Sequence, residues 1–96
     1  MTRAERLKRN RKNILSLAKH YGVTDIRVFG SASRGDDTPE SDIDFLVELE
    51  PNRNLFDVGG ILIEQENLLG CKVDVLTEKS LHWYIRDKVL AEAKPL

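Results

Sequence analysis

The chain has 96 residues, enough for one small domain with a single sheet and a few helices. Hydrophobic residues make up 41% of it and charged residues 32%, which is typical of a soluble globular protein and excludes a disordered one. Its apolar stretches are much shorter than the roughly 20 residues of a membrane span, so we expect a cytoplasmic protein. The one cysteine, Cys71, excludes an internal disulfide framework and a cysteine-rich zinc site.

The net charge of −1 hides an uneven distribution of charge. Residues 1–20 carry seven Lys and Arg, whereas residues 36–50 carry seven Asp and Glu and no base. The basic segment lacks interleaved aromatic residues, so it is predicted as a solvated helix face and direct nucleic-acid binding is not expected. The acidic segment concentrates repulsion that a bound cation would relieve.

The first half of the chain predicts a helix, a strand, a loop and a second strand. Thr2 is a typical N-cap, apolar residues then recur at helical spacing, and Gly22 ends the helix. Residues 25–29 predict a strand. Residues 30–41 are rich in Gly, Ser, Asp and Pro and predict a loop, with room for one helical turn. Alternating apolar residues from Ile43 to Leu49 predict the second strand.

The second half predicts a helix over residues 55–69, a strand over 72–76 and a last helix ending near Ala93. Gly70 closes the first of these helices, and Thr77 or Ser80 begins the last. Trp83 and Tyr84 are predicted as packing residues of that helix. The order α-β-β-α-β-α indicates an α/β (α+β) fold, with a small three-stranded mixed sheet flanked by about four helices and residues 1–96 forming one domain.

Asp42 and Asp44 are the leading candidates for metal binding. Residues at i and i+2 of a strand lie on one face, roughly 6–7 Å apart, so two carboxylates there can share divalent cations. Two Asp on one strand also conflict with strand propensity, which points to a function. A plain turn signal before the strand would explain Asp42 but not Asp44.

Asp74 is the third candidate carboxylate, because it alternates with Val73 and Val75. If the second and third strands are neighbours, Asp74 reaches the Asp42 and Asp44 site; otherwise it is a surface residue of an edge strand. Three carboxylates around two cations are the arrangement of two-metal phosphoryl transfer.

Four residues of the loop region are candidates for nucleotide binding. Gly30 and Ser31 form a turn whose N–H groups and hydroxyl can meet a phosphate. Arg34 can neutralise a triphosphate, or can pair with the acidic loop instead. Ser41, directly before the carboxylate pair, completes the set.

The run GSASRGDDTPESDIDFLV resembles the Gly-Ser, ten-residue, Asp-x-Asp signature of the DNA polymerase β-like nucleotidyltransferases. The VFGSASRG lead-in, the KVDVL strand and the LHWYIRDKVLAEA tail are similar to its minimal nucleotidyltransferase branch. The resemblance spans nearly the whole chain.

The resemblance implies transfer of AMP from ATP to a hydroxyl of a partner protein, a HEPN-domain ribonuclease toxin for which this chain is the antitoxin. By position, Gly30 and Ser31 would contact the triphosphate, and Asp42, Asp44 and Asp74 would hold two Mg²⁺ ions. Asp74 is then also a candidate to accept the proton of the attacking hydroxyl.

Two alternatives stay open from the sequence. The chain could be a non-catalytic antitoxin that inhibits its partner by occlusion and only retains the nucleotide pocket. It could also be a transferase that acts on RNA or a small molecule, although it shows no second domain to hold such a substrate.

Overall fold

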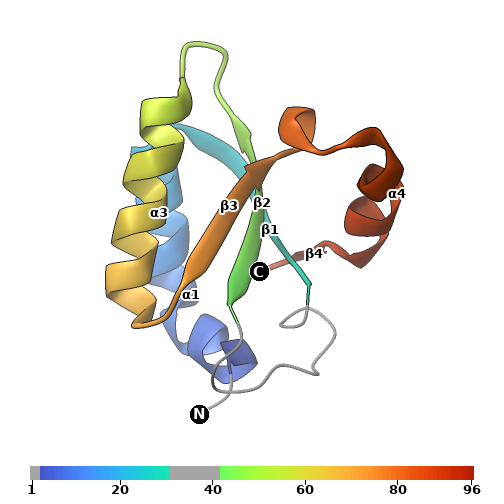
Figure 1. Cartoon of the computed structure of the whole chain (residues 1–96). Coiled ribbons are helices and arrows are strands. Elements are labelled where there is room, and N and C mark those ends of the chain that lie inside the picture. The colour runs from blue at the N-terminus through green and yellow to red at the C-terminus, as the bar shows by residue number, and fades with distance from the viewer. Residues whose placement is uncertain (1–2, 31–41) are drawn as a thin grey trace.

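The structure is a computed structural model that describes residues 3–30 and 42–96 (Figure 1). The elements follow in chain order: α1 (Arg3–His20), β1 (Val23–Phe29), β2 (Ile43–Leu49), α3 (Leu55–Leu69), β3 (Val73–Thr77), the 3₁₀ turn η1 (Glu78–Ser80), α4 (Trp83–Glu92) and β4 (Lys94–Pro95). The helical turn expected between residues 30 and 41 lies outside the described residues. Among the described helices, none has the length and apolar character needed to cross a membrane.

The four strands form one mixed sheet in the order β3-β2-β1-β4. Strands β2 and β3 are parallel, and β1 is antiparallel to both β2 and β4. The prediction of a mixed sheet is confirmed. The condition set for Asp74, that the second and third predicted strands are neighbours, is met. The prediction of three strands missed β4, which is only two residues long and ends on Pro95 at the sheet edge, where a missing N–H is tolerated.

Helices α1 and α3 pack on one face of the sheet, and α4 stands on the other (Figure 1). Successive side chains of β2 point alternately toward these two faces of the sheet. Ile43, Phe45 and Val47 are buried against α1 and α3, whereas Leu46 is buried under α4 together with Phe29. The face of β2 that carries the carboxylates is therefore partly covered as well, which the alternation alone did not predict.

Helix α3 spans the predicted residues and is fixed at both ends. Asn54 is its N-cap: its side chain accepts from the Phe56 N–H, while the Asp57 carboxylate accepts from the Asn54 N–H. Gly70 ends the helix in the left-handed region at φ 67°. The buried Gln65 donates from Nε2 to the carbonyl of Ile14 at 3.2 Å, which joins α3 to α1.

The predicted last helix is divided into two parts. Thr77 caps the short η1 turn, buried Leu81 follows, and α4 begins only at Trp83. The prediction that Trp83 and Tyr84 are packing residues is wrong, because these side chains are 81% and 67% exposed. The helix has too few apolar residues on any one stripe to bury both rings against the sheet.

Candidate active site

The pairing of β2 with β3 brings Asp44 and Asp74 together on one face of the sheet. Asp44 is the direct register partner of Asp74 in the parallel pair, and Asp42 lies two residues before Asp44. The pairing continues past the strand starts, where the Ile43 N–H donates to the Lys72 carbonyl at 3.1 Å. Because directly paired residues project to the same face, Asp44 and Asp74 share the face opposite α1 and α3. Asp42 lies just before the start of β2, two residues from Asp44.

Gly30 lies against Asp44 because of the antiparallel pairing of β1 with β2. Phe29 is the register partner of Asp44, so the chain leaves β1 beside that carboxylate. The Gly30 backbone has φ 74°, and a Cβ built on it would overlap Oδ2 of Asp44. Glycine is therefore required twice at this position, once for the left-handed backbone and once for the space that the carboxylate occupies.

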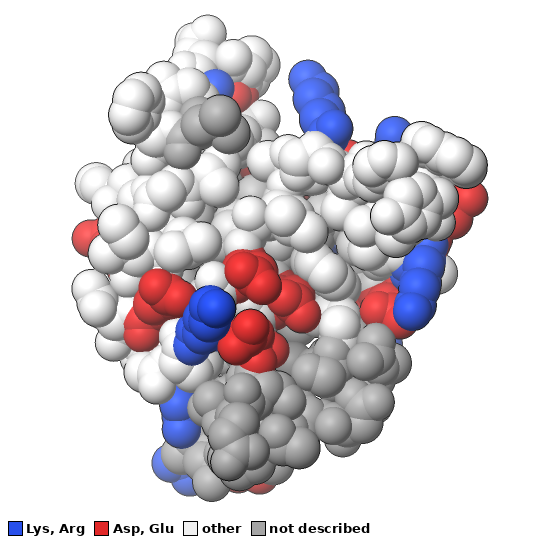
Figure 2. Space-filling model, viewed as in Figure 1, with Lys and Arg blue, Asp and Glu red and all other residues white. Residues whose placement is uncertain are grey.

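The group is acidic and partly exposed. Asp42 and Asp44 are half-buried and Asp74 is exposed. Figure 2 shows acidic side chains gathered over the ends of β2 and β3 where these two strands begin, with a basic side chain beside them. Carboxylate oxygens are the ligands that Mg²⁺ prefers, so the donor chemistry of the group fits a hard divalent cation.

Asp44 and Asp74 share a face and a register, with Asp42 just before β2, but the three carboxylates do not form a closed cage. Within residues 3–30 and 42–96, no three side chains of His, Cys, Asp or Glu stand grouped as ligands of one ion. Mg²⁺ usually keeps several waters and completes its coordination with substrate phosphates instead of using an all-protein cage. An open carboxylate face is compatible with that mode of binding.

Helix α4 limits the site on one side. Leu46 and Leu76 follow Asp44 and Asp74 on the same face of their strands, and both pack in the apolar cluster under α4. The carboxylates occupy the half of this face near the strand starts, and α4 covers the half near the strand ends (Figure 1). The carboxylates are therefore bordered by the apolar side chains of Leu46 and Leu76 and by helix α4.

Three of the four predicted nucleotide-binding residues, Ser31, Arg34 and Ser41, lie outside the described residues. Their predicted roles stay predictions. Gly30 is the member of that set which the structure places, and it stands directly beside Asp44.

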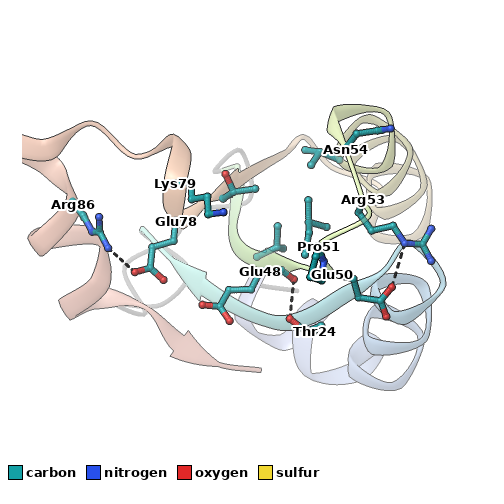
Figure 3. A pocket seen from close by; sticks show the side chains of 13 residues that line it. Thr24, Glu48, Glu50, Pro51, Arg53, Asn54, Glu78, Lys79 and Arg86 are labelled. Carbon is teal, nitrogen blue, oxygen red and sulfur yellow. Dashed lines mark hydrogen bonds and ion pairs between the residues drawn. The ribbon is translucent and has the colours of Figure 1, made fainter.

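A hollow of about 680 Å³ lies at the other end of the sheet (Figure 3). Its lining includes Glu48, Arg53 and Glu78 but none of the three candidate carboxylates. Several of its charges are already paired: Arg86 donates to Glu78 at 2.8 Å, and Arg53 to Glu50 at 3.4 Å. The carboxylate group and this hollow are therefore separate features, and the carboxylate group is the stronger candidate for catalysis.

Comparisons with known proteins identify the family of this chain. The nucleotidyltransferase domain family model matches residues 7–96, and the chain belongs to that family. A solved structure described as a minimal nucleotidyltransferase superposes with a TM-score of 0.88 at 41% identity, covering 100% of this chain and 97% of that one. Within the family, the chain is of the minimal nucleotidyltransferase type.

Two relatives of this chain are named as protein adenylyltransferases. A protein of Methanocaldococcus jannaschii, named as a protein adenylyltransferase (MJ0435), is 43% identical over 86% of this chain and 88% of its own. The protein adenylyltransferase MntA of Thermococcus cleftensis is 38% identical over 79% of this chain and 77% of its own. A crystal structure of a mutant MntA-HpeT toxin-antitoxin complex has a TM-score of 0.74 at 25% identity, covering 91% of this chain and 71% of that one.

Proposed function

We propose that this chain is a Mg²⁺-dependent protein adenylyltransferase that transfers AMP from ATP to a hydroxyl of a HEPN-type ribonuclease toxin, for which it is the antitoxin. The observation that carries the proposal is the register of Asp44 with Asp74, with Asp42 just before β2 and Gly30 beside Asp44. The names of the relatives, which are protein adenylyltransferases, support the choice of nucleotide and acceptor. On this proposal residues 1–96 form one nucleotidyltransferase domain.

The charges of the site require a cation. A triphosphate and three carboxylates repel one another on an open face, so a substrate can settle there only with divalent cations between them. When bound, two Mg²⁺ ions would supply charge neutralisation and polarise the reacting oxygens. Asp42, Asp44 and Asp74 would hold them.

The residues of the chain position the reaction and accept its proton. The backbone at Gly30, with Ser31, Arg34 and Ser41, would orient the triphosphate beside the carboxylates. The acceptor hydroxyl attacks the α-phosphorus, a new O–P bond forms, the bond to the bridging oxygen breaks and pyrophosphate leaves. Asp74, whose side chain is exposed, would receive the hydroxyl proton.

The proposal is tested by the intact mass of the partner. The chain is co-expressed with the product of the neighbouring gene, and that product is weighed by mass spectrometry. We expect added AMP with the wild-type chain and with the control Glu48→Gln, which removes an exposed carboxylate from the same face of β2. We expect none with Asp44→Asn.

A partner that is inhibited but never gains mass with the wild-type chain would contradict the proposal. That result would favour inhibition by occlusion, in which the chain binds its partner without chemistry. Full modification by Asp44→Asn would reject the assigned site while keeping the activity.

A further inference from the structure

Helix α4 buries little of its own surface. Val89 is its one buried side chain, and every residue from Trp83 to Lys88 is exposed. A helix of ten residues is marginal alone in water and normally depends on packing of an apolar face. The contacts of α4 with the described residues use only a small part of the helix.

The first turn of α4 presents apolar rings to solvent. Trp83 is 81% exposed, Tyr84 67% and Ile85 37%. His82 lies beside them, with its ring centroid 4.3 Å from that of Tyr84 and the two rings tilted by 57°. The Trp83 and Tyr84 rings meet edge to face, with their centroids 5.9 Å apart. We call these four residues the α4 aromatic surface.

The composition and size of this surface are those of a protein interface. Trp and Tyr are the residues most enriched among those that dominate the binding energy of interfaces. Together the two rings can bury roughly 300 Å². A standard interface buries about 800 Å² on each partner, so the two rings would supply more than a third of it.

The α4 aromatic surface belongs to the same side of the molecule as the candidate active site. Leu46 and Leu76 contact the apolar cluster that includes Val89 of α4, and they follow Asp44 and Asp74 on the same strand faces. A five-residue strand such as β3 spans about 17 Å. An interface of standard size is about 30 Å across, so one bound protein can cover α4 and reach the carboxylates.

The charges around the rings favour a protein over a polyanion. The next residues, Arg86, Asp87 and Lys88, carry both signs, and Arg86 is already paired with Glu78. A nucleic acid or an anionic membrane would require an excess of positive charge here.

We propose that the α4 aromatic surface is the docking site for the protein that carries the acceptor hydroxyl. The inference rests on the proposed function, because that reaction requires a hydroxyl from another molecule. Docking on α4 would hold the partner beside the open half of the sheet face, where its hydroxyl meets the carboxylate group.

The test compares two exposed apolar sites on opposite faces of the sheet. The probe is the product of the neighbouring gene, purified with and without the chain, and its affinity is measured by calorimetry. Trp83→Ala with Tyr84→Ala should raise Kd at least tenfold, and should raise KM for the protein acceptor with kcat changed less than twofold. The control Phe56→Ala removes an 89% exposed ring from α3 and should change Kd less than twofold.

Two further variants separate loss of docking from loss of folding and from loss of catalysis. Trp83→Glu preserves helix propensity and should weaken binding as strongly, while circular dichroism checks that each variant is folded. Asp44→Asn should bind the partner with unchanged Kd but leave it unmodified.

The remaining outcomes distinguish failure of the docking site from failure of the proposed transfer reaction. If the partner binds the variant without the two rings at the wild-type Kd, the docking site is overturned and the transferase proposal stands. The same conclusion follows if binding of the partner is lost in Phe56→Ala alone. A partner that needs the rings but is never modified supports docking and rejects the transfer. No complex with the wild-type chain, or a self-dimer that the ring substitutions dissociate, overturns the docking site.

Discussion

Gly30 links the backbone of the first strand to the leading catalytic candidate. Its φ of 74° and the carboxylate of Asp44 in the space of its missing side chain make two separate demands for glycine. The residue therefore positions Asp44 sterically, in addition to any contact of its N–H with a phosphate. A substitution here should disturb the site and the fold together.

Gly30→Ala is expected to lower the free energy of unfolding by about 1–3 kcal/mol, because a non-glycine residue at positive φ is strained and its Cβ overlaps Oδ2 of Asp44. Displacement of that carboxylate should also reduce AMP transfer at least tenfold. Chemical denaturation and the transfer assay measure the two effects. Wild-type activity in a folded Gly30→Ala would show that Asp44 does not need its present position.

At this scale the sequence predicts part of the site well. Alternation placed Asp44 and Asp74 on the same side once β2 and β3 were neighbours, whereas Asp42 lies just before β2 and has no register partner there. The contact of Gly30 with Asp44 was not predictable, because it depends on the antiparallel register that pairs Phe29 with Asp44, a tertiary feature that neither strand encodes alone.

At the scale of elements, the two glycines of α3 have different environments. A Cβ at Gly59 would meet nothing within 4 Å, whereas a Cβ at Gly60 would lie 2.6 Å from Cε1 of Tyr21. The structure indicates that Gly60 makes room for the Tyr21 ring and that Gly59 is tolerated.

Gly59→Ala should therefore raise the free energy of unfolding by about 0.5–1 kcal/mol, through higher helix propensity and a less flexible unfolded chain. Gly60→Ala should lower it by about 1–3 kcal/mol, because the Tyr21 ring must move out of its place. Thermal and urea unfolding of the two variants, one residue apart, provide the comparison. Equal effects of the same sign would contradict the assigned packing.

The elements differ in how well their sequences predict them. Helix α3 has a continuous apolar stripe and a terminal glycine, so its bounds were predicted correctly. Helix α4 has no apolar stripe, and its aromatic residues could not be assigned to core or surface from spacing alone. Strand β4 is defined by its pairing with β1, a tertiary contact that leaves almost no local signal.

At the scale of the whole molecule, one face of the sheet carries the main apolar core and the other carries the candidate active site. The face under α1 and α3 holds the main apolar core, whose buried residues run from Leu7 to Val75, and this core supplies most of the stability of the fold. The other face carries a smaller apolar cluster under α4 and the three carboxylates beside it. A chain of 96 residues can place an open acidic site on this second face because the first face already supplies the larger core.

The central claim is that Asp42, Asp44 and Asp74 bind divalent cations together with a nucleotide. Its most direct test is the thermal unfolding of the chain with a non-hydrolysable ATP analogue, with Mg²⁺ or with a chelator. At a ligand concentration a hundred times Kd, binding adds about 2.7 kcal/mol of stability, and each kcal/mol shifts Tm by about 4–8 °C in a domain of this size. We expect this Mg²⁺-dependent rise in the wild type and in Glu48→Gln, and its loss in Asp44→Asn and Asp74→Asn. A full Mg²⁺-dependent rise in Asp44→Asn would contradict the assignment of the cation site.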